Sequence, residues 1–235
     1  MSVVRIGFDM DGVLADFSTA FRDVEKRLFG AGSVLPAESP EVEARQEEDA
    51  AAQAAAPGSS PRETRRRRDA VWKEIHDTTD FWTTLKPHDP GAVRRIYDMM
   101  LRHGLEVFFI TQRPATLGQT VQRQTQCWLR QQGFDLPSVL VISGSRGAAA
   151  GALRLDYHVD DSPQNCLDIV SDSRARPILI VAEPDAVTEN SAKRLRIGVA
   201  RSIGQALDIL EHTLTGRGND GPRLLDKLSR MVGRK

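Results

Sequence analysis

Two aspartates, one residue apart, close the first apolar segment of the 235-residue chain. The segment 3–8 is a short apolar run typical of a buried strand, and Asp9 and Asp11 follow it. Alternation along a strand places both carboxylates on one face, where they repel each other unless a cation or a proton lies between them. Gly12 then permits a sharp turn and the close approach of a ligand.

Polar residues also follow two later apolar segments. The Thr-Gln-Arg run 111–113 follows the segment 105–110, and the two aspartates 160–161 follow the segment 155–159. In a doubly wound parallel sheet, ligands bind at the carboxyl ends of the strands. We therefore expect these polar residues to gather with the first two aspartates at one edge of a sheet.

The elements that would position these residues alternate between strands and helices. Strands are expected at 3–8, 105–110, 139–142, 155–159, 178–181 and 197–200, and helices at 17–29, 71–75, 89–103, 117–132, 146–153 and 203–214. Asp89 is the expected N-cap of its helix with Pro90 as the first helical residue, and Leu117 is expected to face inward from the next helix. This alternation predicts an α/β fold with a doubly wound parallel sheet and right-handed crossovers.

One segment breaks the pattern. Residues 36–69 are rich in Glu, Ala and Gln, contain a Pro-Gly-Ser-Ser-Pro break and have hardly any large apolar side chains. Such a composition cannot bury enough surface to offset its ordering entropy, so we expect a partly disordered insertion. The four arginines at 65–68 invite a nucleic-acid interpretation, but the acidic residues just before them are the favoured partner. We do not expect a nucleic-acid partner.

The bulk composition gives no sign of a strongly charged partner. The 32 Lys and Arg residues balance the 32 Asp and Glu residues, which favours neither nucleic acid nor membrane. The two cysteines, Cys127 and Cys166, lack metal-type spacing and favour a reducing compartment. The sequence contains no apolar run long enough to cross a bilayer, and its first residues match a core strand better than a signal peptide. We expect a cytoplasmic protein with no membrane partner, and the sequence leaves its oligomeric state open.

Three of these polar runs resemble motifs of one superfamily. The run Asp9-Met10-Asp11-Gly12 resembles motif I of the haloacid dehalogenase-like (HAD-like) superfamily. Thr111 occupies the place of motif II, and the pair 160–161 the place of motif IV. The run 160–165 is similar to the Asp-Asp-x-Pro-x-Asn pattern of that superfamily.

The resemblance implies a domain organisation. A Rossmann-like HAD-like catalytic core would comprise residues 1–16 and 86–212. A small helical cap would be inserted between the first and second motifs, at residues 17–85, and would contain the low-complexity segment. Residues 213–235 would form a basic C-terminal tail.

The resemblance also implies a mechanism. Asp9 would attack phosphorus and form an aspartyl-phosphate, while Asp11 would protonate the leaving oxygen and then activate the hydrolytic water. Thr111 would hold a phosphate oxygen through its hydroxyl and the next backbone N–H. Mg²⁺ would bind Asp9, the backbone carbonyl of Asp11 and one or both of Asp160 and Asp161, leaving positions for waters and a phosphate oxygen.

Motif III departs from the pattern of the superfamily, which uses Lys, and sometimes Arg, to neutralise the nucleophile and the phosphate. Arg146 is the residue that aligns, and Arg154 is the alternative. Arginine supplies the same charge, and its planar fork suits phosphate. Arg113, just past motif II, is a third candidate and an alternative substrate contact. We expect His158 to be a satisfied core histidine and not a catalytic one.

Within the superfamily, the run 9–17 and the stretch 81–87 look like the 5′(3′)-deoxyribonucleotidase family. That family removes phosphate from nucleoside monophosphates and stacks the base on aromatic rings near the cap. The resemblance implies a magnesium-dependent 5′-nucleotidase. The alternatives are a phosphatase for another small metabolite or a polynucleotide end, and a catalytically silent phosphate-binding protein. The residues expected to bind the substrate are Gly12, Phe17, Gln112, Arg113, Phe81 and Trp82.

Overall fold

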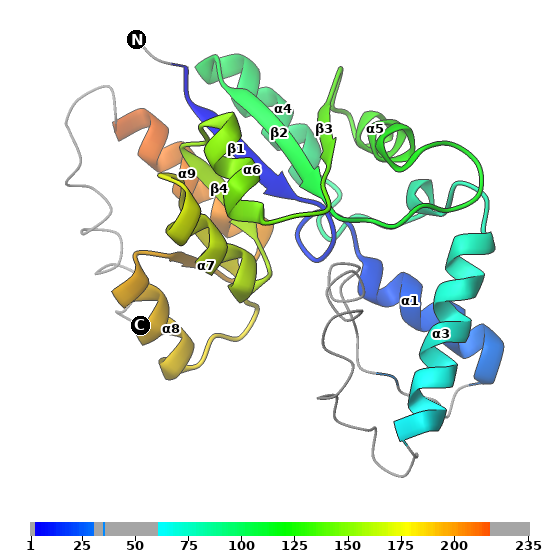
Figure 1. Cartoon of the computed structure of the whole chain (residues 1–235). Helices are drawn as coiled ribbons and strands as arrows, with labels where there is room; N and C mark the ends of the chain where they lie inside the picture. The colour runs from blue at the N-terminus through cyan, green and yellow to red at the C-terminus, as the bar shows by residue number, and fades with distance from the viewer. Residues whose placement is uncertain (1–2, 31–34, 36–60, 217–235) are drawn as a thin grey trace.

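The computed structural model describes residues 3–30, 35 and 61–216. These residues form a six-stranded sheet in the order β3-β2-β1-β4-β5-β6, with every pair of neighbours parallel (Figure 1). Its strands are β1 (Arg5–Asp9), β2 (Glu106–Thr111), β3 (Ser138–Val141), β4 (Tyr157–Asp160), β5 (Arg176–Ile180) and β6 (Gly198–Ala200). β1 lies inside the sheet, hydrogen-bonded to β2 on one side and to β4 on the other. The predicted doubly wound, Rossmann-like α/β fold is confirmed.

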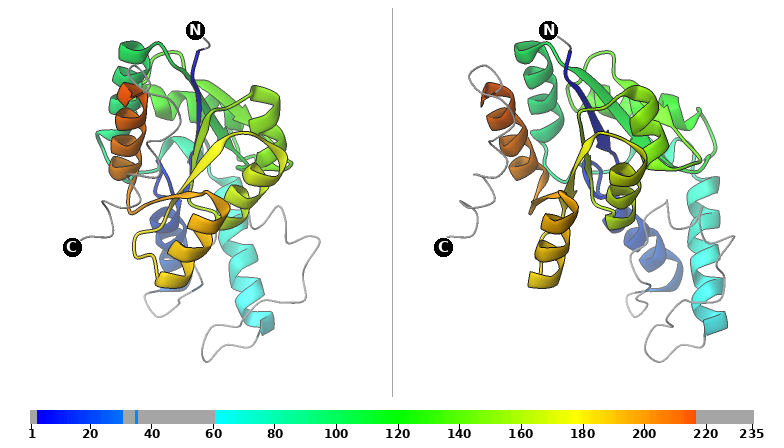
Figure 2. Two further views of the ribbon diagram at one scale, coloured as in Figure 1. Left: turned by 90° about the vertical axis from the view of Figure 1, so that its left-hand side faces the viewer. Right: turned by 60° about the vertical axis from the view of Figure 1, so that its left-hand side comes forward.

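Helices cover both faces of this sheet (Figure 2). One face carries α4 (Ala92–His103), α5 (Val121–Gln131) and α9 (Ile203–Gly216), and the other carries α6 (Arg146–Leu153), α7 (Pro163–Asp172) and α8 (Ala186–Leu195). The main core lies on the first face, because alternate residues of β1, Ile6 and Phe8, share one apolar cluster with α4 and α9. Over the ranges that the structure describes, no helix has the length and apolar character to cross a bilayer.

Two helices form a small cap beyond the carboxyl end of β1 (Figure 1). α1 (Phe17–Phe29) packs against α3 (Pro61–Asp77), and the short helix η1 (Phe81–Thr83) leads the chain back to the core. The buried residues of α1 recur at helical spacing and face α3. The Phe17 ring stacks on Trp72 of α3 with 5.5 Å between the ring centroids. Aromatic packing therefore joins the two cap helices.

α3 begins earlier than the sequence pattern indicates, because the four arginines at 65–68 lie inside it. An ion pair between Glu63 and Arg67, one turn apart and 2.7 Å long, supports this part of the helix. The helix then continues into the buried residues Val71 and Ile75. The prediction that the disordered insertion extends to residue 69 is therefore wrong. Its remainder, the acidic residues favoured as the arginine partner, and the tail from 217 on lie outside the described residues.

The start of α4 differs from the prediction. The Asp89 carboxylate accepts a hydrogen bond from the Gly91 backbone N–H at 2.8 Å, which closes a turn at Pro90. α4 therefore begins at Ala92 with Gly91 as its N-cap. The expected roles of Asp89 as N-cap and Pro90 as first helical residue are wrong.

The start of α5 also differs. Leu117 is exposed and precedes the helix, so the prediction that it faces inward is wrong. Its backbone N–H donates to the carbonyl of His76, and its own carbonyl accepts from the N–H of Asp80. These two bonds tie the segment before α5 to the end of the cap. The helix begins behind Thr120, whose hydroxyl accepts from the backbone N–H of Arg123.

Candidate active site

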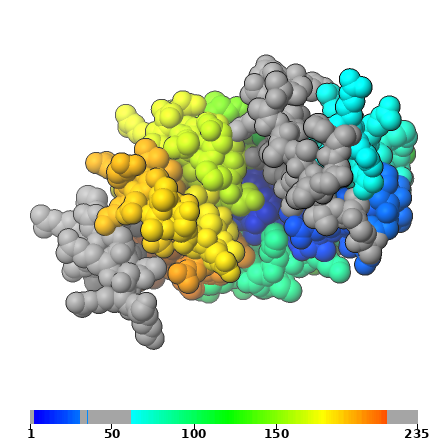
Figure 3. All heavy atoms as spheres, turned by 90° about the horizontal axis from the view of Figure 1, so that it is seen from below, coloured from blue at the N-terminus to red at the C-terminus, as the bar shows by residue number. Residues whose placement is uncertain are grey.

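The carboxyl ends of β1, β2 and β4 meet at one edge of the sheet, and each strand ends in a buried polar residue. These residues are Asp9, Thr111 and Asp160. The strand order reverses at β1, so this edge is the switch point where doubly wound sheets bind their ligands. Seen from below, atoms of the blue N-terminal part lie recessed beside the yellow-green atoms of the α6–α7 region (Figure 3). The structure thus brings together three residues that the sequence predicted for the site.

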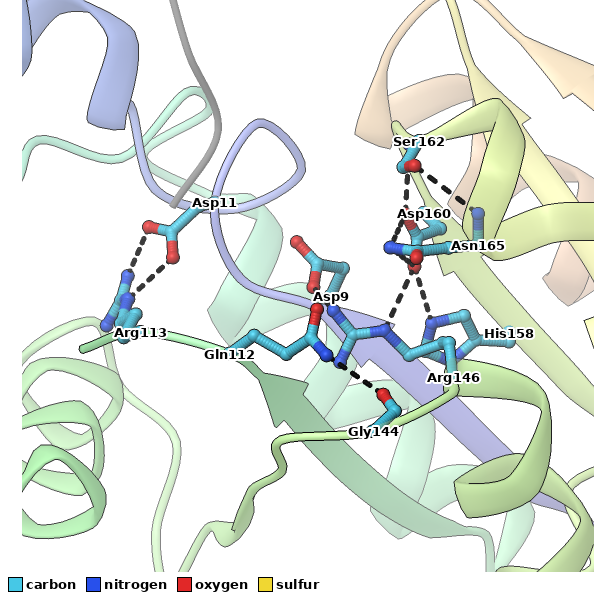
Figure 4. A network of polar contacts seen from close by, with 10 residues as sticks. All are labelled: Asp9, Asp11, Gln112, Arg113, Gly144, Arg146, His158, Asp160, Ser162 and Asn165. Atoms are coloured by element: carbon cyan, nitrogen blue, oxygen red, sulfur yellow. Dashed lines mark hydrogen bonds and ion pairs between the residues drawn. The ribbon is translucent and has the colours of Figure 1, made fainter. Parts of the chain in front are cut away.

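Arg146 is the cation nearest to Asp9. Its Nη2 donates to Asp9 Oδ1 at 2.7 Å, and its Nε lies 3.5 Å from Asp160 Oδ2 (Figure 4). Arg146 is the first residue of α6, and it is buried. Arg154, the alternative, is the exposed C-cap of the same helix. The helix therefore directs its N-terminal arginine to the acids and leaves the C-terminal one at the surface.

A close contact between α6 and α7 sets the position of Arg146. A Cβ atom on Gly147 would lie 2.1 Å from the carbonyl oxygen of Asp168 in α7. No side chain fits in that space, so glycine is required for α6 to approach α7 this closely. The position of Arg146 therefore depends on the neighbouring glycine, whose role the sequence did not indicate.

Asp160 has hydrogen-bond partners on both of its carboxylate oxygens. Oδ1 accepts from the backbone N–H of Ser162 at 2.9 Å and from Asn165 Nδ2 at 3.1 Å. Oδ2 lies 3.0 Å from His158 Nε2 and also faces Arg146. The pKa of the Asp160 carboxyl is lowered because, although burial raises it, the contacts to His158 and Arg146 outweigh burial. Asp160 is thus a carboxylate held in a fixed place, and Asn165, to which the sequence assigned no role, is one of the residues that hold it.

His158 is buried in β4 and supports Asp160. Burial lowers the pKa of its imidazole, so the ring is neutral at physiological pH. Because an ionised Asp160 can only accept, the proton of His158 lies on Nε2. Nδ1 has no hydrogen-bond partner among the described residues and faces Gly7, where a Cβ would lie 2.4 Å away. His158 is a core histidine, as predicted, but only one of its nitrogens is satisfied.

Asp161 completes the acidic cluster on the side of the motif I turn. A Cβ atom on Gly12 would lie 1.9 Å from Asp161 Oδ2, so the carboxylate rests directly on the glycine. Burial, and then the charge of Asp160, raise the pKa of Asp161 to about 7. Burial also raises the pKa of Asp9 well above its ordinary value; Arg146 opposes this, while Asp160 and Asp161 add to it. The cluster therefore has more carboxyl groups than its arginine can neutralise when all of them are ionised.

A divalent cation would neutralise the remaining carboxylates of the cluster. Carboxylate and carbonyl oxygens are the donors that Mg²⁺ prefers, and the ion commonly uses one or two carboxylates and keeps several waters. No three acidic, histidine or cysteine side chains in the described part of the chain converge as a ready ligand group. A magnesium site with few protein ligands does not need such a group. Asp9, Asp161 and the backbone carbonyl of Asp11 fit this donor set, whereas Asp160 already has partners on both oxygens.

Asp11 points to a different arginine. Arg113 Nε and Nη2 donate to the two carboxylate oxygens of Asp11, each at 2.7 Å, and both side chains are buried. Arg113 Nη1 donates to the Thr125 hydroxyl of α5 at 3.1 Å. The guanidinium also lies over the Trp82 ring of η1, 4.8 Å from its centroid. Arg113 is thus the partner of Asp11, and the sequence did not predict this pairing.

Gln112 directly follows the carboxyl end of β2 and contacts the loop before α6. Its Nε2 donates to the carbonyl of Gly144 at 2.9 Å, and its Oε1 has no hydrogen-bond partner in the part of the chain that is described. Figure 4 shows the Gln112 side chain directed to Gly144. This bond ties the end of β2 to the loop before α6.

The three aromatic rings expected to hold a base are part of the core. Phe17, Phe81 and Trp82 are only 2%, 4% and 0% exposed. Phe17 contacts Trp72 and Trp82, and Trp82 contacts Phe81 with 5.1 Å between the ring centroids. Apolar burial explains this packing, because the three rings share one core with the buried side chains of α1 and α3. The prediction that these rings stack on a substrate base is contradicted by their burial.

Phe81 does border a cavity, but not the acidic cluster. A cavity of about 310 Å³ lies between α1 and the segment 78–86, and its lining includes Asp16, Asp23 and Lys86. None of the aspartates of the cluster lines it. This cavity lies at the junction of cap and core and is distinct from the switch point.

Replacing Gly12 tests the turn. Gly12→Ala is expected to lower both turnover and melting temperature, because φ is +84° and the new Cβ would collide with the Asp161 carboxylate. Gly104→Ala is the control: φ is +63° there, but nothing lies within 4 Å of the new Cβ. It should lower the melting temperature by a small amount and leave turnover unchanged. Equal effects of the two variants on turnover would contradict a specific fit between Gly12 and Asp161.

No protein-family model matches the chain, and no curated protein matches it in sequence. Solved structures do match. A haloacid dehalogenase-like family hydrolase from Streptococcus pneumoniae has a TM-score of 0.52 at 11% identity, covering 88% of this chain and 98% of that one. A candidate β-phosphoglucomutase from Thermotoga maritima has a TM-score of 0.51 at 17% identity, covering 89% and 99%. A hydrolase from Pseudomonas syringae has a TM-score of 0.50 at 13% identity, covering 90% and 99%. The chain therefore has the fold of HAD-like hydrolases.

Proposed function

We propose that this chain is a magnesium-dependent phosphatase that hydrolyses phosphomonoesters through an aspartyl-phosphate intermediate. The observation that carries the proposal is the buried pair of Asp9 and Arg146 at the switch point of the sheet, 2.7 Å apart and beside two further aspartates. A carboxylate at this place can attack phosphorus, and an adjacent guanidinium can neutralise the phosphate charge. The HAD-like fold supports the same conclusion.

Each step uses a residue of the site. An oxygen of Asp9 attacks phosphorus, the ester P–O bond breaks, and the leaving oxygen takes a proton from Asp11. Water then attacks the aspartyl-phosphate and gives a proton to Asp11; the bond between Asp9 and phosphorus breaks and phosphate leaves. Thr111 and the backbone N–H of Gln112 hold a phosphate oxygen, and Arg146 offsets charge on the phosphoryl group. Mg²⁺, held by Asp9, Asp161 and the Asp11 carbonyl, would supply further charge neutralisation.

For the substrate, we propose nucleoside monophosphates first. The similarity of the run 9–17 and the stretch 81–87 to 5′(3′)-deoxyribonucleotidases supports this choice. The burial of Phe17, Phe81 and Trp82 removes the stacking argument for it. The class of phosphomonoester substrate therefore has weaker support than the chemistry at Asp9.

A substrate panel tests the proposal. The purified chain is assayed with and without Mg²⁺ on dUMP, dTMP, other nucleoside monophosphates, sugar phosphates and phosphorylated oligonucleotides, with Asp9→Asn as the control for contaminating phosphatase. We expect magnesium-dependent phosphate release, with the highest kcat/KM on a nucleoside monophosphate. A preference for a sugar phosphate or an oligonucleotide end would contradict the proposed substrate class but not the proposed phosphatase mechanism. No release from any member would favour a silent phosphate-binding protein.

A further inference from the structure

Arg113 holds both carboxylate oxygens of Asp11. Both carboxylate oxygens accept from Arg113 at 2.7 Å in the parallel, two-point geometry that arginine favours. Figure 4 shows the Asp11 carboxylate directed to Arg113, while Asp9 is directed to Arg146. In this arrangement both oxygens of Asp11 are turned toward Arg113 and not toward Asp9. To act as a general acid, the Asp11 carboxyl group must take up a proton from solvent and turn from Arg113 toward the reacting phosphate.

Arg113 is itself fixed from two other sides. Thr125 of α5 accepts from its Nη1, and the Trp82 ring lies beneath its guanidinium. Trp82 is in turn anchored, because its indole N–H donates to the Pro114 carbonyl at 3.0 Å and its backbone N–H donates to Gln124 Oε1 at 3.0 Å. A buried guanidinium with this many contacts cannot follow Asp11 into the site. Arg113 is therefore held by α5 and η1 independently of Asp11.

We propose that Arg113 is a positioning residue for the acid/base Asp11, a role that rests on the proposed phosphatase function. Between proton transfers Arg113 holds the Asp11 carboxylate at a defined distance from the acidic cluster. Without Arg113, Asp11 would lie near Asp9 and Asp161 with no counter-ion, and their repulsion would displace it. The consequence is that Arg113 contributes to proton donation although it does not touch the substrate.

The test compares leaving groups. An alkyl phosphomonoester such as a nucleoside monophosphate needs a proton on its leaving oxygen, whereas acetyl phosphate, with a carboxylate leaving group, does not. The ratio of kcat/KM between these substrates therefore reports proton donation in the first chemical step. General acid catalysis is typically worth ~10²–10⁴-fold, and we expect Asp11→Asn to lower the ratio by that order.

Arg113→Met is expected to lower the same ratio by about 10-fold to 100-fold, while kcat/KM for acetyl phosphate changes little. Arg113→Lys should recover only part of the loss, because lysine has the charge but not the two-point fork. Thr125→Val removes one anchor and should lower the ratio severalfold in a chain that keeps the ion pair. If Arg113→Met does not fold, the ratio measured for Thr125→Val tests the role of Arg113. Arg123→Met is the matched control. Arg123 is an exposed arginine on the first turn of α5, the helix that carries Thr125, and its replacement should leave the ratio unchanged.

Three results would overturn the proposal. An equal loss on both substrates in Arg113→Met and Thr125→Val would assign Arg113 to stability alone. A higher KM for both substrates with an unchanged ratio would assign Arg113 to substrate binding. A higher ratio would mean that Arg113 inhibits Asp11. The phosphatase proposal is judged separately, since it fails if Asp9→Asn keeps its activity and stands if Asp11→Asn alone shows the selective loss.

Discussion

Asp9→Asn is expected to abolish phosphatase turnover, by on the order of 10⁴-fold or more, because the variant lacks the nucleophile on which both chemical steps depend. Asparagine keeps the shape of the side chain and an oxygen that can accept from Arg146 Nη2. The variant should therefore fold. The measurement is phosphate release on the best substrate of the panel, together with mass spectrometry of acid-quenched protein, in which the wild-type chain should carry one phosphoryl group and the variant none.

The stability of Asp9→Asn provides a second check. Burial and the neighbouring acids raise the pKa of Asp9 although Arg146 opposes them, so its charge is unfavourable in the metal-free chain. Removing that charge relieves the repulsion among the acids, and Arg146 keeps Asp160 as a counter-ion, so the melting temperature of the metal-free chain should fall much less than in Arg146→Ala. Mg²⁺ should then raise the melting temperature of the variant less than that of the wild type. Retention of turnover, or of the phosphoryl label, in the variant would exclude Asp9 as the nucleophile.

Arg146→Ala should impair both stability and turnover. The Arg146 side chain is buried between Asp9 and Asp160, so alanine leaves the acidic cluster without its nearest cation. Breaking a buried ion pair by removing one partner typically costs about 3–5 kcal/mol of unfolding free energy. Loss of one preorganised donor to the phosphoryl group should reduce kcat by about 10²–10³-fold. Chemical denaturation and steady-state kinetics measure the two effects.

Two companion variants separate the arginines of α6. Arg146→Lys restores a cation near Asp9 and should recover most of kcat, although not the contact to Asp160. Arg154→Ala replaces an exposed arginine at the other end of the helix and should be close to wild type in both measurements. If Arg154→Ala proved the more damaging change, the charge that acts on the phosphate would come from Arg154.

The placement of Asp9, Thr111 and Asp160 could be predicted from the sequence because each follows an apolar run that ends abruptly. In a parallel sheet the carboxyl ends of the strands lie on one edge, so residues that follow separate runs come together without knowledge of the loops. The same reasoning gave the strand pattern, since buried parallel strands are continuous apolar runs.

The direction of individual side chains could not be predicted in this way. Asp11 and Arg113 are 102 residues apart, and their pairing depends on Thr125 and Trp82, which only the folded chain places around Arg113. The same holds for Phe17, whose position after motif I suggested a ring at the mouth of the site. Its burial results from packing against α3, and the sequence around residue 61 gave no helical apolar pattern from which to predict where that helix starts.

The backbone contact at Gly147 packs α6 closely on α7, and the first turns of these helices carry Arg146 and Asn165, which both contact Asp160. Laboratory evolution towards a new substrate should therefore find few tolerated changes at this junction, because any side chain on Gly147 displaces both groups together. The outer faces of α1 and α3 touch neither group and should accept many changes. Under the proposed function, substitutions in the cap helices would then change which substrate is dephosphorylated, and the chemistry at the sheet edge would stay the same.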